Sequence, residues 1–251
     1  MTTIQFRSHT CTIPERADEM TPKQYLAALR AALIPSDHNA RIQVLGQSLL
    51  NLPLPPSLYR NTTPADHAAL QHAVEQFIDR DGQLHLYPLT NLLPQYHQWR
   101  ARCGDMLNHM LFSDFLYALS AMRRLRQPHA GDTDEAVTQL VRAMYTHPDP
   151  HAKPPAILAL HAMTLFSSVW QHITQYPVPL DGEDIPYNIL FQQSPHGRYD
   201  DDRLGWQGIR LEIARSAVFG PVRQVDRTPL WDILTYLYKC RKEHNRKTRR
   251  P

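Results

Sequence analysis

Proline placement limits the fold of this 251-residue chain more than any other feature of its sequence. Three prolines directly follow a threonine at the start of a helical apolar pattern, at Thr21-Pro22, Thr63-Pro64 and Thr228-Pro229. A threonine hydroxyl can accept a hydrogen bond from an amide of the first helical turn, and proline at the next position lacks only an amide that would be unpaired there. The three pairs therefore predict three helix starts.

Helical periodicity fills most of the chain before residue 145. Apolar residues recur every three or four positions in five segments, which begin at Pro22, Ser36, Pro64, Gln95 and Asp132. The third segment runs to about Asp79, and the fourth runs to Gln127 as one or two helices. Asp132, with Glu135 three residues on, is predicted to cap the fifth.

The later part of the chain has three further helical segments. We expect helices from Ala156 to about Tyr176, from Leu204 to Val218 and from Pro229 onward. The first has apolar residues on most faces, which predicts a helix that is covered all round. Residues 177–203 lack periodicity beyond one short possible strand. We therefore predict a mainly α-helical, bundle-like protein with at most one or two short strands.

One segment divides the chain by composition. Thr146–Pro155 reads THPDPHAKPP, and four prolines in ten residues exclude both a helix and a central strand. The predicted organisation is an N-terminal helical part, 1–145, and a C-terminal helical part, 156–245, followed by a basic tail, 246–251. The two helical parts can also pack as one domain.

Few residues suggest chemistry. His147–His151 reads HPDPH and Asp200–Asp202 is a carboxylate cluster, but a solvated loop explains each better than a metal does. Cys103 has no base beside it in sequence, and His161, alone on an apolar helix, is expected to be a satisfied core histidine. No phosphate-binding glycine loop or G-x-S-x-G motif occurs. We expect no enzymatic activity, no cofactor and no metal; a metal-dependent hydrolase that uses Asp200–Asp202 is the least favoured alternative.

The cysteine pattern and the hydropathy of the chain indicate its cellular compartment. Cys11, Cys103 and Cys240 are far apart and odd in number, which favours neither disulfides nor a thiolate zinc site. The first twenty residues have no apolar core of signal-peptide length. The longest apolar run, 156–170, is shorter than the roughly 18 residues expected of a membrane span. We expect a cytoplasmic protein with no membrane contact.

The last helix has two halves of different character. Leu230, Ile233, Leu234 and Leu237 form an apolar stripe at helical spacing, flanked by two aromatic residues. This stripe is predicted to dock either within the fold or on a protein partner. The candidate partner-binding residues are Leu230, Trp231, Leu234, Leu237 and Tyr238.

Cations are concentrated in the second half of that helix and the residues after it. Residues 239–251 contain seven cations and one carboxylate, so the rest of the chain is net negative although the whole carries +3. Cations at a helix C-terminus favour the helix dipole, but they can also bind phosphates. The candidate nucleic-acid contacts are Lys239, Arg241, Lys242, Arg246, Lys247, Arg249 and Arg250.

Both ends of the chain resemble a known group. IPERADEMTPKQYLAAL, Ile13–Leu29, and VFGPVRQVDRTPLWDILTYLYKCRKEHN, Val218–Asn245, are similar to the corresponding stretches of phage and prophage tail-region proteins, which include tail-assembly chaperones. The resemblance covers under a fifth of the chain. It implies a helical, non-enzymatic protein that holds another phage component during assembly. The alternative is a helical protein that binds nucleic acid through its basic end.

Overall fold

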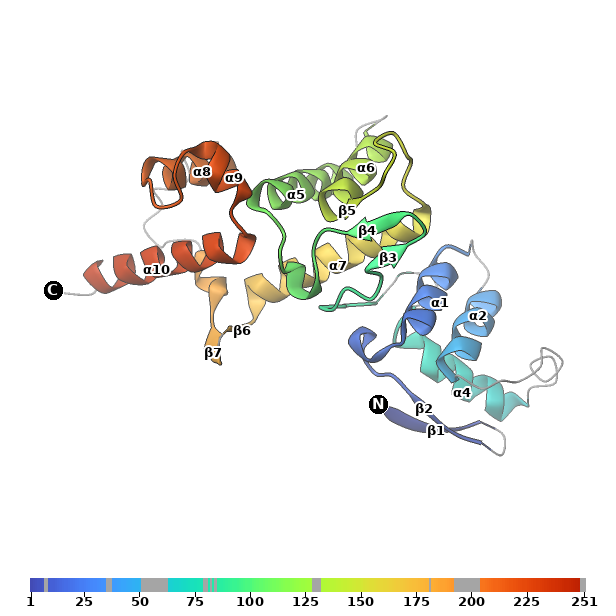
Figure 1. Ribbon diagram of the computed structural model, residues 1–251. Helices are drawn as coiled ribbons and strands as arrows, with labels where there is room; N and C mark the ends of the chain where they lie inside the picture. The colour runs from blue at the N-terminus through green and yellow to red at the C-terminus, as the bar shows by residue number, and fades with distance from the viewer. Residues whose placement is uncertain are drawn as a thin grey trace. The chain divides into compact units, whose positions relative to one another are not determined.

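A computed structural model describes residues 1–6, 9–34, 38–50, 63–78, 81, 83, 85–127, 132–180, 182–191 and 204–248 (Figure 1). The protein is mainly α-helical, as predicted. The expectation of one or two strands is too low, because the described residues contain three small antiparallel sheets, of two, three and two strands.

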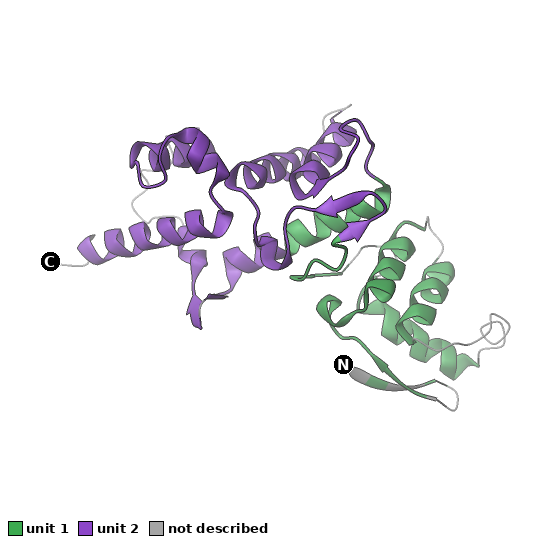
Figure 2. Cartoon of the chain, in the orientation of Figure 1, with its two compact units in different colours: residues 1–94, 155–168 green, residues 95–154, 169–251 purple. Residues whose placement is uncertain are grey.

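The chain forms two compact units that exchange segments (Figure 2). Unit 1 consists of residues 1–94 and 155–168, and unit 2 of residues 95–154 and 169–251. This division differs from the expected one, 1–145 and 156–245. It differs because Thr146–Pro155 is not a spacer: Thr146 pairs with Arg100 in a sheet, and Arg142 donates to the carbonyl of Ala152.

Unit 1 begins with a hairpin that the sequence analysis missed. Strands β1 (Thr2–Phe6) and β2 (His9–Ile13) pair antiparallel from Thr2↔Ile13 to Phe6↔His9. Phe6, Cys11 and Ile13 are buried in the core of the unit. The hairpin exists because both strands place apolar side chains against that core.

The described residues of unit 1 contain four α-helices or parts of α-helices. They are α1 (Pro22–Ala32), α2 (His38–Leu50), α4 (Pro64–Glu75) and the first part of α7 (Ala156–Gln175), to Ser168. Two of them, α1 and α4, begin where the Thr-Pro pairs predict. Thr21 and Thr63 both form complete capping boxes, with Gln24 and Asp66. The start predicted at Ser36 lies outside the described residues.

Close helix packing in unit 1 depends on one glycine. A Cβ at Gly46 of α2 would lie 2.9 Å from Cδ2 of Leu70 in α4. Glycine therefore lets the two helices approach where a larger residue would push Leu70 aside. The core also buries the predicted inward residues of α4 and the turn after it, Leu70, Val74, Phe77 and Ile78.

An extended segment, residues 85–94, closes unit 1. Asp18, in the 3-10 helix η1 (Ala17–Glu19), accepts hydrogen bonds from the amides of Leu89 and Thr90, both at 2.9 Å. Leu86, Leu92 and Leu93 of the segment are buried. Local polar contacts and apolar anchors therefore hold this segment without regular secondary structure.

Unit 2 contains the largest correction to the predicted helices. Residues 95–111 were expected to be helical, but they form strands β3 (Gln95–Tyr96) and β4 (Trp99–Ala101), which join β5 (Tyr145–Thr146), and then the 3-10 helix η2 (Asp105–Leu107). His97, Met106, Leu107 and His109 have positive φ. An α-helix cannot accommodate that backbone, so Met106 and Met110 lie outside any α-helix.

The remaining elements of unit 2 are mostly helices. They are α5 (Phe112–Arg126), α6 (Thr133–Met144), α7 from Val169 on, hairpin strands β6 (Val178–Leu180) and β7 (Glu183–Ile185), the 3-10 helix η3 (Tyr187–Leu190), α8 (Trp206–Arg215), α9 (Val222–Arg227) and α10 (Leu230–Thr248). Helix α9 was not predicted. A bidentate pair between Arg210 and Asp226 joins it to α8.

Part of helix α7 has the covering that its sequence predicts: none of residues 157–170 is exposed, whereas Ala156, Gln171 and Gln175 are. Among the described helices it alone meets the length and composition expected of a membrane span, and half of its apolar window is buried within the protein. A covered core helix meets the same criteria.

Candidate functional site

The HPDPH segment forms a self-contained turn. The amide of Asp149 donates to Nδ1 of His147 at 3.0 Å, and the amide of His151 donates to Oδ1 of Asp149 at 2.8 Å. The ring of His147 packs on Trp99 with centroids 4.8 Å apart. The side chains of His147 and Asp149 are thus engaged in contacts that stabilise the turn. Across the described ranges, no group of three or more His, Cys, Asp or Glu is arranged to hold a metal ion.

The other chemical candidates are placed as follows. Asp200–Asp202 lies outside the described residues. Cys103 is buried, and burial, with the charge of Asp114, raises the pKa of its thiol to about 12. A thiol with that pKa stays protonated at neutral pH and is a poor nucleophile.

His161 is a satisfied core histidine, as its position on an apolar helix predicts. Its Nε2 lies 3.1 Å from Oδ1 of Asn91, and its Nδ1 lies 2.9 Å from the hydroxyl of Tyr25. The same Asn91 oxygen accepts the amide of Leu93 at 3.1 Å, which identifies it as an acceptor. His161 must therefore donate from Nε2, and its bare Nδ1 accepts the Tyr25 hydroxyl proton.

Burial fixes the charge of this histidine. The ring has no exposed surface, and desolvation lowers the pKa of His161 to about 3. The same cause raises the pKa of Tyr25. The Asn91–His161–Tyr25 chain is thus a neutral polar connection between α1, α7 and residues 85–94 inside unit 1.

The first half of α10 docks within unit 2. Leu230, Ile233 and Leu234 are fully buried. The amide of Leu230 donates to the carbonyl of Met110 at 2.8 Å, and the indole nitrogen of Trp231 donates to the carbonyl of Met106 at 3.1 Å. Four of the five candidate partner-binding residues, Leu230, Trp231, Leu234 and Tyr238, therefore contact other parts of this unit; Leu237 is half-buried.

An aromatic ladder on α10 starts at a residue that the sequence analysis missed. Tyr187 of η3 is fully buried, and its hydroxyl lies 2.8 Å from that of Thr235. Its ring lies 5.6 Å from Trp231 and 5.8 Å from Tyr238, centroid to centroid. The ammonium of Lys242 lies 5.7 Å above the Tyr238 ring. The sequence offers little indication of this role, because Tyr187 follows a proline in the segment 177–203, which has no helical periodicity.

The second half of α10 is a helix on the surface. Lys239, Lys242, Arg246 and Lys247 are exposed and Arg241 is half-buried, on the helix that runs from α9 to the C-terminus (Figure 1). The expected tail boundary at 246 therefore does not mark the end of the helix. Arg249 and Arg250 lie outside the described residues. The five described cations and Glu243 form the charged surface of the protein's last turns, named here the basic half-helix (Lys239–Lys247).

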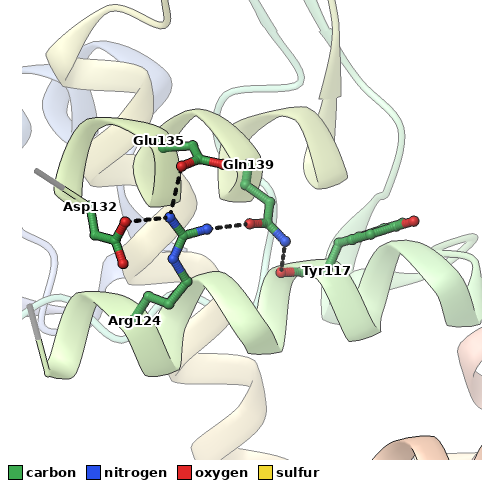
Figure 3. Close-up of polar contacts among 5 residues, drawn as sticks. All are labelled: Tyr117, Arg124, Asp132, Glu135 and Gln139. Carbon is green, nitrogen blue, oxygen red and sulfur yellow. Dashed lines mark hydrogen bonds and ion pairs between the residues drawn. The ribbon is translucent and has the colours of Figure 1, made fainter. Parts of the chain in front are cut away.

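Arg124 illustrates a charge cluster whose role is structural (Figure 3). The predicted cap Asp132 makes no capping hydrogen bond, because its carboxylate binds Arg124 at 3.2 Å. Arg124 also donates to Glu135 at 3.1 Å and to Gln139 at 3.1 Å, and Gln139 donates to the carbonyl of Tyr117 at 3.2 Å. This network joins the end of α5 to the start of α6.

Replacing Arg124 by methionine should loosen the start of α6, because methionine keeps the aliphatic length and loses every donor. We expect faster amide hydrogen exchange in Thr133–Ala136 and little change in α10. Arg124→Lys should give an intermediate rate, since one ammonium cannot serve three acceptors in the guanidinium geometry. Unchanged exchange in α6 would show that the network does not hold the helix start.

No family model, no curated protein and no solved structure matches this chain. The class of the protein is therefore defined by its own structure: a mainly helical protein of two compact units whose last helix is docked at one end and exposed at the other.

Proposed function

We propose that this chain is a non-enzymatic assembly factor that holds another macromolecule through the basic half-helix, as a tail-assembly chaperone would hold a phage structural component. The observation that supports this proposal most directly is the exposure of the basic half-helix at the end of a firmly docked helix. The partner's surface would be acidic.

Helix energetics support a binding role for this segment. A helix of this length without a packed face is marginal in water, because nucleation is costly and most helical stability in proteins comes from burial. The docked half supplies the nucleus, so the basic half-helix is already formed and oriented when a partner arrives. Preformed structure lowers the entropy that binding must overcome.

A truncation tests the proposal. A chain ending at Tyr238 should keep its melting temperature within a few degrees, because the removed residues bury little apolar surface, and should lose its complex with a tail structural protein co-expressed from the same gene cluster. The measurement is co-purification from cells that express both proteins, with the full chain as reference. A complex that survives the truncation, or no complex with the full chain, would contradict the proposal.

A second candidate function, nucleic-acid binding through the same half-helix, is favoured by one observation. Three of its cations, Lys239, Lys242 and Arg246, are spaced at i, i+3 and i+7, so they share one face of α10. Cations on one face of a helix can contact several phosphates of a nucleic-acid strand at the same time.

A further inference from the structure

The cations of the basic half-helix are not spread evenly around α10. Lys239, Lys242 and Arg246 lie on the side opposite the buried Leu230 and Leu234. Arg241 lies seven residues after Leu234, above the docked face, and it is half-buried. The three aligned residues, named here the cationic face, are exposed and continue the side of α10 that carries Thr235 and Tyr238, which contact Tyr187 of η3.

One member of the cationic face is held in place. Lys242 sits over the ring of Tyr238, whose edge meets the buried ring of Tyr187, and the Tyr187 hydroxyl pairs with Thr235. Each contact limits the freedom of the next side chain. Lys242 therefore loses less side-chain conformational entropy when it binds an anion than a freely rotating lysine would.

The composition of the basic half-helix distinguishes between anionic partners. It contains no Phe, Tyr or Trp, its one aromatic ring is the imidazole of His244, and Cys240 is its only apolar side chain. Single-stranded nucleic acid is bound largely by stacking on aromatic rings, and membranes are bound by helices with an apolar face. With a single imidazole and no apolar face, this segment is less suited to either mode than to electrostatic contact with phosphates.

The spacing fits a regular row of phosphates. The rise of 1.5 Å per residue separates Lys239 from Lys242 by about 4.5 Å and Lys242 from Arg246 by about 6 Å along the axis. Over that length of about 10 Å, one strand of a duplex presents about three phosphates. Glu243, the one carboxylate among residues 239–247, leaves this stretch with a net positive charge.

We propose that the cationic face binds the phosphate backbone of double-stranded nucleic acid, without reading its sequence. The inference rests on the second candidate function and names its ligand and its contact residues. Electrostatic binding of this kind releases one counterion for each neutralised phosphate, so it weakens steeply with salt.

Two double substitutions in the full chain test the proposal. Lys239→Gln with Arg246→Gln removes two cations from the cationic face, and Arg241→Gln with Lys247→Gln removes two from elsewhere on the same half-helix. The net charge of the two variants is equal. Binding to a 20-base-pair DNA duplex is measured by fluorescence anisotropy across a salt series, with one strand of that duplex and poly-glutamate as parallel probes.

The first pair should weaken duplex binding roughly 50-fold at 0.1 M monovalent salt, and should lower the slope of log affinity against log salt by about 1.8. The second pair should weaken it less than about threefold, because those cations act only from a distance. Circular dichroism checks that both variants keep their helix content.

Each other outcome has one meaning. Equal losses of duplex affinity in both variants would contradict the assignment of the cationic face as the contact surface, but would leave nucleic-acid binding by the half-helix intact. Tighter binding to the single strand than to the duplex would contradict the proposal that the ligand is double-stranded. Absence of binding to either form of DNA overturns the second candidate function. Binding to poly-glutamate but not to DNA would show that the half-helix binds carboxylates and not phosphates, which also overturns the proposal.

Discussion

Acidification from pH 6.5 toward pH 3 should lower the free energy of unfolding by up to about 1.4 kcal/mol per pH unit through His161 alone. The unfolded chain takes up a proton on this histidine below its ordinary pKa of 6.5, whereas burial lowers the pKa in the fold to about 3. Between those values the unfolded state binds more protons. Stability therefore falls as the pH falls, and the loss is complete near pH 3.

The geometry explains why the folded ring resists protonation. Nδ1 of His161 accepts the Tyr25 hydroxyl, and Nε2 already donates to Asn91. A second proton on Nδ1 would make the fully buried ring a cation, and burial disfavours that charge even if the Tyr25 hydroxyl rotates to accept the new N–H. Asp18, whose charge adds to burial in raising the pKa of Tyr25, accepts hydrogen bonds from the amides of Leu89 and Thr90.

His161→Gln isolates this contribution. Glutamine can still donate to Asn91 and accept from Tyr25, but it does not titrate. The difference between the urea-unfolding free energies of the parent and the variant should shrink by about 1.4 kcal/mol per pH unit from pH 6 to pH 4. His151→Gln, at an exposed position in the turn 146–155, should leave the slope of the parent unchanged. Parallel curves for the parent and His161→Gln would contradict the assignment.

Truncating Phe115 to alanine should cost about 3–5 kcal/mol of stability, the range for removing a fully buried aromatic side chain. Phe115 has no exposed surface, and its ring lies 5.4 Å from that of Trp170 and 5.3 Å from that of Trp206. The cavity would open where α5, α7 and α8 meet within unit 2. Trp170 and Trp206 themselves lie 6.1 Å apart, and the loss of Phe115 removes a ring that contacts both of them, as Phe191 also does.

The matched control is Tyr117→Ala, two residues further along α5. The Tyr117 side chain is 59% exposed, and its bond to Gln139 is made by the backbone carbonyl, which alanine keeps. We expect a change within about 0.5 kcal/mol. Urea unfolding followed by tryptophan fluorescence reports on both variants. A similar cost at the two positions would show that the aromatic cluster is not the packed centre of unit 2.

Local sequence patterns predicted the parts of the fold that depend on local hydrogen bonds. Thr21 and Thr63 precede prolines and cap the helices predicted to start there; both form capping boxes, although Asp66 was not expected to complete the one at Thr63. The third pair, Thr228-Pro229, also precedes a helix, although the Thr228 hydroxyl donates to the carbonyl of Gln224. At Thr21 and Thr63 the chemistry of neighbouring residues is sufficient.

Pairings between distant residues were not predictable in this way. Residues 95–111 have apolar spacing that fits a helix, but Ala101 pairs with Tyr145 and Leu111 forms a bridge with Pro229. Asp132 has the sequence of a helix cap and instead binds Arg124. Competing partners from elsewhere in the chain outweighed the local preference at both places.

The candidate site shows the same limit. The sequence indicated an apolar stripe and a basic end in the last helix, and left open whether the stripe docks inside the protein or on a partner. The structure places most of the stripe against unit 2 and leaves the basic half-helix on the surface. Whether a partner binds there stays a prediction.

By itself, then, the sequence determined the helical class, most helix starts and the place of His161 in the core, because capping and periodicity act over a few residues. Only the tertiary structure decided the partners of His161, which lie 136 and 70 residues away in the chain, and which side of α10 faces solvent. The physical reason is that burial and hydrogen-bond partners depend on which distant segments meet, and no local pattern encodes that choice.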